Sequence, residues 1–223
     1  MNSAVTAATL DAYERWAPSY PPVPHNPLMR AEQEGMLRYW PDVEGKRALD
    51  LACGSGRYSR LLQQSRAAHV VALDFCQPML TKVSDVPRVR ADMMSLPFAR
   101  DSFDVVICGL AIGHAQSLDT WMCEVARVLG PGGRLLYSDF HPAAVGVGLT
   151  RSFKDAADQT WTVPHSTYDP EVQLRAAARA GLTVEAVHEI RVGFELTEPF
   201  PRSQEFYARC RGVPIVLIVR ARK

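Results

Sequence analysis

The sequence predicts an α/β fold built around an open, doubly wound sheet of mostly parallel strands. From residue 46 onward, short apolar segments typical of strands alternate with amphipathic segments typical of helices. This alternation favours parallel pairing through right-handed crossover helices. Segments such as VVALD and DVVICGL are almost continuously apolar, which is expected of strands covered by helices on both faces of the sheet.

Two helices are expected before the alternating region, over residues 4–16 and 28–39. The segment SYPPVPHNP at 19–27 separates them, because consecutive prolines cannot continue a helix. This segment is typical of a rigid arm or hinge and is too short to link two domains. We therefore expect residues 1–45 to form a helical N-terminal lid or arm, and residues 46–223 to form the main domain.

Strands and helices should alternate regularly in the main domain from its first strand up to Asp139. Over residues 140–168 this alternation is no longer regular. The next helix has Asp169 as its expected N-cap, Pro170 at its first position and Gly181 at its end. The expected strands are 47–52, 69–74, 88–92, 103–110, 133–139, 182–190 and 213–220, and the expected helices are 57–65, 77–83, 118–129, 170–180 and 204–211.

Length and charge limit the functional classes. The 223 residues suit one compact domain, and 25 basic against 24 acidic side chains leave a formal net charge of +1. This balance gives no overall attraction to nucleic acid or to an anionic membrane. The N-terminus has no basic start followed by an apolar run, and the apolar run at 213–219 is too short to cross a bilayer. We expect a cytoplasmic protein that acts on a small molecule.

The cysteines indicate neither a disulfide framework nor a metal site. They are odd in number and form no C-x-x-C pair. Their neighbours are apolar, which is typical of buried structural thiols. The five are Cys53, Cys76, Cys108, Cys123 and Cys210.

The segment ALDLACGSG at 48–56 is the first candidate binding feature. Gly54 and Gly56 lie where the first strand meets its helix, at the sheet edge where open α/β folds bind ligands. Without Cβ atoms the main chain can approach a ligand closely, and the helix N-terminus offers free N–H groups. Asp50, just before the turn, would discourage a pyrophosphate and could hold an ammonium group. The loop also only half matches a dinucleotide fingerprint, so an adenosyl ligand carrying an amino acid is favoured.

Carboxylates end the next two strands. Asp74 ends VVALD about twenty residues beyond the glycines, where a carboxylate can accept both ribose hydroxyls. Asp92 ends RVRAD and precedes Met93 and Met94, which together offer an acceptor for an exocyclic amine and apolar cover for a purine. Glycines and acids at the tips of successive strands indicate a nucleoside-containing cofactor.

With these residues the chain resembles the class I S-adenosylmethionine-dependent methyltransferases, specifically the small single-domain kind (methyltransferase type 11) typified by quinone-biosynthesis C-methyltransferases and the malonyl-carrier-protein methyltransferase of biotin synthesis. The resemblance covers about residues 46–140, through ALDLACGSGRYSRLL, VVALDFCQPML, VRADMMSLPFARDSFDVVICGLAIGH and EVARVLGPGGRLLYSD. It implies a Rossmann-like sheet of seven strands, the last antiparallel. It also implies S-adenosyl-L-methionine as cofactor, with S-adenosyl-L-homocysteine as product.

The resemblance implies a role for single positions along the cofactor. Ala52 departs from the glycine that many family members carry, at the cost of one methyl group of clearance. The implied contacts are Asp50, Ala52, Gly54 and Gly56 for the methionine part, Asp74, Phe75, Met79, Asp92 and Met93 for the ribose and adenine, and Cys108 with Gly109 below the sulfonium.

Three histidines are candidates for the chemistry. Methyl transfer is an in-line displacement at an activated carbon, so the enzyme mainly aligns the reactants and excludes water. A base with a near-neutral pKa helps when the acceptor is a hydroxyl or an acidic carbon, and histidine suits this role. His141, which Asp139 could orient, and His165 are the candidate bases, and His114 is a candidate for the substrate or methionine pocket.

The N-terminal region should close over the cofactor. The Y-x-x-x-A-x-x-Y segment from Tyr13 to Tyr20 resembles a segment that does so in related enzymes. Tyr20 is the expected lid residue, since a tyrosine near a sulfonium is favourable. Arg30 is a candidate partner of the cofactor carboxylate.

By the same resemblance, residues 140–168 form the substrate wall. Aromatic residues in and beyond this insertion indicate an apolar acceptor, and packing in the core explains several of them equally well. Basic residues could instead form a docking face for an acyl-carrier protein. The aromatic set is Phe153, Trp161, Tyr168, Phe194, Phe200 and Phe206, and the basic set is Arg151, Lys154, Arg175 and Arg179.

The predicted function is methyl transfer to a small molecule, with oxygen, nitrogen and carbon all open as the nucleophile. The alternatives are carboxyl methylation of an acyl-carrier-bound substrate, cofactor binding without turnover, and nicotinamide-dependent oxidoreduction on the same sheet. Binding of S-adenosylhomocysteine or of a dinucleotide separates the last alternative from the others.

Overall fold

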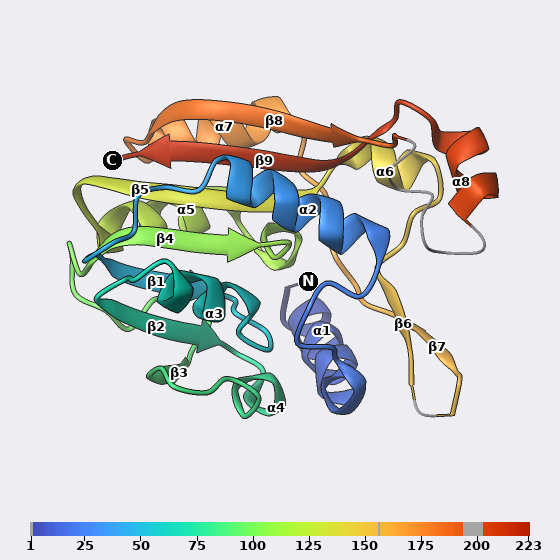
Figure 1. Cartoon of the computed structure of the whole chain (residues 1–223), viewed down its shortest axis with the longest axis horizontal. Helices are drawn as coiled ribbons and strands as arrows, with labels where there is room; N and C mark the ends of the chain where they lie inside the picture. Colours follow the sequence, from blue (N-terminus) through green and yellow to red (C-terminus); the bar gives the residue numbers. More distant parts are fainter. Residues whose placement is uncertain (1, 156, 194–202) are drawn as a thin grey trace.

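A computed structural model describes residues 2–155, 157–193 and 203–223 (Figure 1). Seven strands form one sheet in the order β3-β2-β1-β4-β5-β9-β8. β9 runs antiparallel to both β5 and β8, whereas the other neighbours pair in parallel. The prediction of a doubly wound, mostly parallel seven-stranded sheet with an antiparallel last strand is confirmed.

The strands follow the apolar segments of the sequence closely. β5 begins earlier than predicted: Leu129 pairs with Phe103, and regular pairing resumes only between Arg134 and Val105. The glycine-rich turn therefore forms an irregularity within β5. The sheet strands are β1 (Arg47–Leu51), β2 (His69–Asp74), β3 (Arg88–Arg90), β4 (Phe103–Gly109), β5 (Leu129–Phe140), β8 (Thr183–Arg191) and β9 (Pro214–Arg222), and β6 (Ser152–Lys154) with β7 (Thr160–Thr162) form a separate hairpin.

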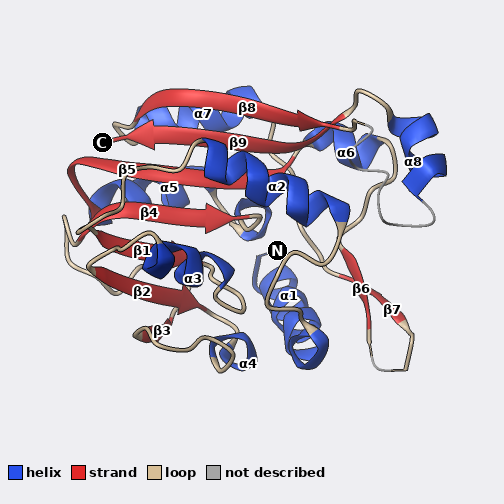
Figure 2. Ribbon diagram, viewed as in Figure 1, coloured by secondary structure: helices blue, strands red, loops and turns tan. Residues whose placement is uncertain are grey.

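Helices cover both faces of the sheet (Figure 2). Alternate residues of β1 point to opposite faces: Leu49 belongs to the core with Trp121, and Ala48 to the core with Met36. The helices are α1 (Asn2–Trp16), α2 (Pro27–Arg38), α3 (Arg57–Gln64), α4 (Gln77–Leu80), α5 (Leu118–Val128), α6 (Pro142–Gly146), α7 (Pro170–Arg179) and α8 (Ser203–Cys210), with 3₁₀ turns η1 (Ala17–Ser19) and η2 (Ile112–His114).

Helix ends follow local chemistry, with one correction. The Asn26 side chain accepts a hydrogen bond of 2.8 Å from the N–H of Met29 and so caps α2. Asp169 occupies the N-cap position of α7 but makes no side-chain hydrogen bond to the helix, so the predicted cap is wrong in its chemistry. Gly181 follows the end of α7 with a φ of +80°, as predicted for a helix terminator.

The second N-terminal helix packs as part of the body rather than as a lid. Met36 is fully buried, and a Cβ on Gly35 would lie 2.5 Å from Cδ1 of Ile218 in β9. The glycine therefore lets α2 lie directly against the sheet. Of the two N-terminal helices, α1 lies beyond the strand ends and α2 lies across the sheet (Figure 1).

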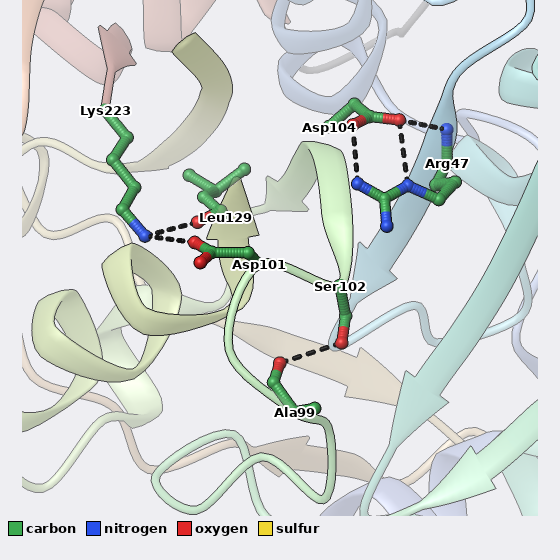
Figure 3. Close-up of polar contacts among 7 residues, drawn as sticks. All are labelled: Arg47, Ala99, Asp101, Ser102, Asp104, Leu129 and Lys223. Carbon is green, nitrogen blue, oxygen red and sulfur yellow. Dashed lines mark hydrogen bonds and ion pairs between the residues drawn. The ribbon is translucent and has the colours of Figure 1, made fainter. Parts of the chain in front are cut away.

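The amino ends of the central strands are held together by polar contacts (Figure 3). Asp104 accepts hydrogen bonds from the Arg47 N–H at 2.9 Å and from Arg47 Nη2 at 2.8 Å. Lys223 Nζ bonds Asp101 at 2.7 Å and also the carbonyl of Leu129. Asp104 thus anchors the start of β4, far from the carboxyl ends of the strands.

The cysteines are all free thiols, and four of them are buried. Cys123 is exposed on α5, which corrects the expectation that every cysteine is buried.

No helix within the described ranges combines the length and apolar character needed to cross a bilayer.

Candidate active site

A cavity of about 560 Å³ lies at the carboxyl ends of the parallel strands. Its floor includes Asp74 at the end of β2, Gly109 at the end of β4 and Phe140 at the end of β5. Tyr13 and Tyr20, from the N-terminal segment, complete the wall. The position is the ligand crevice expected of an open α/β sheet.

The cover of this cavity combines α1 with the β6–β7 hairpin. Trp16 stacks on Phe153 with ring centroids 4.8 Å apart, and the guanidinium of Arg15 lies 4.7 Å from the ring centroid of Trp161. Trp16 also faces the cavity, whereas Phe153 and Trp161 do not line it. These two residues were expected to contact the acceptor, and the structure instead places them in the packing between the two parts of the cover.

The glycine loop is shaped to hold Asp74. Ala52 and Gly54 both have left-handed backbones, with φ of +55° and +54°. The N–H of Gly54 donates to Asp74 Oδ2 and the N–H of Cys76 to Oδ1, each at 2.8 Å. Burial raises the pKa of the Asp74 carboxyl. Two fixed backbone donors orient this carboxylate and leave lone pairs for further donors.

The residues predicted for the adenosine lie along the same wall. Asp92 accepts a hydrogen bond of 2.9 Å from the N–H of Met94. Phe75, Met79 and Met93 line the cavity between Asp74 and Asp92. The structure therefore brings this predicted set together.

Four predicted cofactor contacts do not line the cavity. Asp50 is buried and accepts hydrogen bonds from the N–H and Oγ of Ser59, at 2.7 and 2.6 Å, so it holds the start of α3. Burial raises the pKa of Asp50 to about 6. Gly56 is the N-cap of α3 with a φ of +79°, Cys108 is fully buried, and Arg30 is exposed on α2.

The cavity wall includes the cation of a buried ion pair, Arg57 with Glu32, and does not include Arg30. Arg57 lines the cavity, and its Nη2 lies 2.7 Å from Oε2 of Glu32, which is completely buried. Oε1 of Glu32 accepts hydrogen bonds from Tyr58 at 2.6 Å and Ser138 at 2.5 Å. Burial opposes the charge on Arg57, but Glu32 outweighs it and the pKa of Arg57 is raised. The signal was present in the sequence, because Glu32 lies three residues after Met29 and four before Met36, on the buried stripe of α2.

A second polar cluster joins the cover to the floor. The hydroxyl of Tyr13 lies 3.0 Å from Nε2 of His114, and Nη1 of Arg151 donates to the Tyr13 oxygen at 2.9 Å and to the Leu110 carbonyl at 2.7 Å. Burial lowers the pKa of His114 well below its usual value, and the charge of Arg151 adds to this. Arg151 was predicted to belong to an exposed docking face, and that prediction is wrong because its side chain is buried in the cavity wall.

The two predicted bases do not face the cavity. Nδ1 of His141 accepts the N–H of Ala143 at 3.1 Å and so caps α6, and its Nε2 lies 3.4 Å from Glu189. The ring of His165 packs 5.3 Å from that of Phe140. These positions remove the geometric basis for assigning either histidine as the base.

Tyr168 lines the cavity, whereas Asp139 does not. Asp139 does not orient His141; its Oδ1 lies 3.8 Å from Nη2 of Arg151, and burial raises the pKa of Asp139 to about 6. Tyr168 lines the cavity as predicted, and its hydroxyl donates to the carbonyl of Ala115 at 2.8 Å.

The remaining predicted basic residues come from two elements, Lys154 from β6 and both Arg175 and Arg179 from α7. Each is paired with an acid: Lys154 with Asp158, Arg175 with Glu171 and Arg179 with Asp119. Of the other aromatic candidates, Phe194 and Phe200 lie outside the described residues, as does the side chain of Phe206. Within the described ranges, no group of three or more His, Cys, Asp or Glu side chains is arranged to hold a metal ion.

Comparison with known proteins agrees with this architecture. Residues 49–137 match the methyltransferase domain family. The chain is 39% identical over 105 residues to the demethylmenaquinone methyltransferase of Corynebacterium glutamicum (strain R), a match that covers 46% of this chain and 45% of that protein. It is 33% identical over 144 residues to the malonyl-acyl-carrier-protein O-methyltransferase of Erwinia billingiae, covering 62% of this chain and 55% of the relative. These matches span about half the length of the relatives.

Solved structures extend the likeness over most of the chain. An S-adenosylmethionine-dependent methyltransferase from Mesorhizobium loti has a TM-score of 0.70 at 24% identity, covering 86% of this chain and 98% of the other. The residues matched by the methyltransferase domain family include the loop and strand ends that line the cavity. Residues 49–137 thus match a methyltransferase domain, and the chain is similar to S-adenosylmethionine-dependent methyltransferases.

Proposed function

We propose that the protein transfers the methyl group of S-adenosylmethionine to a small-molecule acceptor. The observation that carries the proposal is Asp74, a buried carboxylate fixed by the N–H groups of Gly54 and Cys76 on the cavity wall. A carboxylate held in this way suits the hydroxyls of a ribose. The cofactor, when bound, supplies a methyl group on a positively charged sulfur.

The residues present fit an adenosyl amino acid. Asp74 would take the ribose hydroxyls, Asp92 the exocyclic amine, and Phe75, Met79 and Met93 the ring faces. Ala52 and Gly54 would let the main chain approach the amino-acid part, and a Cβ on Gly54 would meet no protein atom within 4 Å. Arg57, with Glu32 behind it, is the cation on the wall that we assign to the cofactor carboxylate in place of Arg30.

The chain's own contribution is alignment and exclusion of water. Tyr13, Trp16 and Tyr20 cover the cavity, and aromatic faces near a sulfonium are favourable. His114 on the wall has a pKa held low by burial, so it stays neutral and accepts hydrogen bonds. Nε2 of His114 is already engaged by Tyr13 and Arg151, so we assign this histidine to positioning these two residues rather than to proton removal from the acceptor.

Carboxyl methylation of a carrier-bound acyl group is a second candidate, because the chain is similar to malonyl-acyl-carrier-protein O-methyltransferases. A carrier protein would need a docking face other than the predicted basic one, since Arg151 is buried and the three other cations are paired.

The test is transfer of an isotope-labelled methyl group from S-adenosylmethionine to a library of small molecules, with a loaded carrier protein as a separate arm. Asp92→Asn should lower the rate by weakening cofactor binding, and Asp119→Asn, an exposed acid outside the cavity, is the matched control. Labelled product from a small molecule supports the proposal. Binding of S-adenosylhomocysteine without any labelled product would assign the chain as a cofactor-binding protein without turnover.

A further inference from the structure

The cavity has two ends that differ in charge. The sheet order places β2 and β3 on one side of β1, and β5 and β9 on the other. The wall therefore runs from Asp74 and Asp92 to Phe140 and Ile215. We call the second part the acceptor end. It is formed by Phe140, Leu149, Thr150, Arg151, Ser152, Ser166, Tyr168 and Ile215.

The charged side chains of the wall lie mostly away from the acceptor end. Among the described residues that line the cavity, four have side chains that are ordinarily charged at neutral pH: Arg57, Asp74, Asp92 and Arg151. Asp74 and Asp92 lie at the opposite end, and Arg57 is paired at 2.7 Å with the buried Glu32. Of the four, only Arg151 belongs to the acceptor end.

The charge of Arg151 is compensated and covered. Its Nη2 lies 3.8 Å from Oδ1 of the buried Asp139, and its Nη1 donates to Tyr13 and to the Leu110 carbonyl. Nε and Nη2 have essentially no accessible surface, and the ring of Phe140 lies 4.8 Å from the guanidinium carbon. A ligand at the acceptor end therefore meets a neutral pair of side chains behind the wall and no reachable cation.

The other titratable side chains of this region are neutral. Burial lowers the pKa of His114 well below its usual value, and burial raises the pKa of Tyr13 and of Tyr168. The imidazole thus carries no charge and the two phenols keep their protons. Neither an anion nor a cation finds an opposite charge here.

The remaining surface of the acceptor end is apolar or carries hydroxyl groups. Phe140, Leu149 and Ile215 supply the apolar part. Thr150, Ser152 and Ser166 are exposed residues of the same wall, and a hydroxyl both donates and accepts hydrogen bonds without bearing a charge. Such a surface suits an apolar molecule that has a neutral polar group.

We infer, building on the proposed methyl transfer, that the acceptor is an uncharged molecule with an apolar body and a neutral hydrogen-bonding group such as a hydroxyl, a carbonyl or an amide. A carboxylate or an ammonium group that entered the acceptor end would lose hydration without gaining an opposite charge, and this costs free energy. A neutral molecule avoids that cost. Carboxyl methylation of a carrier-bound acyl group is thereby disfavoured, because its nucleophile is a carboxylate.

Calorimetry on the full chain saturated with S-adenosylhomocysteine tests this inference. S-adenosylhomocysteine lacks the sulfonium charge, so the titrations at neutral pH report the charge of the wall alone. Each probe series compares an amide, a carboxylate and an ammonium compound of similar shape. The series are benzamide, benzoate and benzylammonium; cinnamamide, cinnamate and cinnamylammonium; and octanamide, octanoate and octylammonium. In at least one series the amide should bind roughly tenfold more tightly than both charged members.

Asp139→Asn tests the origin of this preference. It leaves the guanidinium of Arg151 without its carboxylate, so the carboxylate probe should gain on the amide by roughly threefold, while the ammonium probe should not. Asp119→Asn removes an exposed acid outside the cavity and should keep the wild-type preference. The wild-type titrations decide the matter alone if Asp139→Asn does not fold.

The inference is overturned if a charged probe binds as tightly as its amide in every series, or if no amide binds. It is also overturned if a folded Asp139→Asn protein has the same ratio of carboxylate to amide affinity as the wild type. Failure of S-adenosylhomocysteine to bind is measured separately and would count against the proposed function instead.

Discussion

Oε2 of Glu32 lies 2.7 Å from Nη2 of Arg57, which joins a fully buried acid on the N-terminal helix α2 to a cation on the cavity wall. Both partners belong to segments that are 25 residues apart in sequence. The pair fixes α2, the start of α3 and the floor beside Ser138 relative to one another. Arg57 is therefore held in place before any ligand arrives.

Glu32→Gln should destabilise the protein by about 3 kcal/mol, because it leaves the charge of Arg57 without its partner. The same variant should weaken S-adenosylhomocysteine binding, since Arg57 loses its fixed position. Urea denaturation and calorimetry measure the two effects. Glu34→Gln, an exposed acid on the same helix, should change stability by less than about 0.5 kcal/mol; equal effects of the two variants would contradict the assignment.

Gly54→Ala should cost about 1 kcal/mol of stability, because an L-residue is strained at a φ of +54°. It should also lower cofactor affinity, since the added methyl group would keep the main chain of the cavity wall further from the cofactor. Gly181→Ala is the matched control, with a φ of +80°, no neighbour within 4 Å and a position outside the cavity. We expect a similar loss of stability there with unchanged affinity, and a loss of affinity in both variants would show that strain alone is responsible.

Trp16→Ala should weaken S-adenosylhomocysteine binding by roughly tenfold, because it removes the stacking on Phe153 that joins α1 to the β6–β7 hairpin. Deletion of residues 1–25, which leaves α2 and its N-cap Asn26 in place, should have a larger effect. Val23→Ala, at an exposed position of the arm, serves as the control in the same calorimetric titration. Wild-type affinity in the deletion variant would refute the role of α1 as a lid.

The contribution of Asp50 and Asp139 to stability should fall as the pH rises from about 4 to about 6. Burial raises the pKa of Asp50 and of Asp139 to about 6, so between the ordinary carboxyl value and about 6 the folded state binds more protons than the unfolded state. The stabilisation is complete below the unfolded pKa and is lost as the pH passes through the folded pKa. Asp139→Asn should flatten the profile by on the order of 1 kcal/mol in urea denaturation; a slope identical to wild type would contradict the burial of a titrating Asp139.

The sheet, and the position of Asp74 and Asp92 on one wall of the cavity, were predictable because they depend on short-range patterns. Strand periodicity located β1, β2 and β4, and the carboxyl ends of parallel strands meet at one edge, so Asp74 and Asp92 had to lie close together. The same logic fails for His141. Its position just after β5 was correct, but whether a side chain faces the cavity depends on its neighbours, here Ala143 and Glu189.

Arg151 and Glu32 show which contacts could not be predicted from the sequence. Charged residues on a hairpin and a helix are usually solvated. The spacing of Glu32 from Met29 and Met36 indicates its burial, but the sequence does not reveal its hydrogen bond from Tyr58, nor the one from Arg151 to Tyr13. Both contacts join segments distant in sequence. The aromatic residues of the insertion divide in the same way: Tyr168 lines the cavity as predicted, whereas Trp16 of α1 packs on Phe153.

Titration of the full chain with S-adenosylhomocysteine, and in parallel with a nicotinamide dinucleotide, tests the central claim most directly. The account predicts saturable binding of S-adenosylhomocysteine at one site per chain, strongly weakened in Asp74→Asn, and no binding of the dinucleotide. Absence of S-adenosylhomocysteine binding, or preferential binding of the dinucleotide, would contradict it.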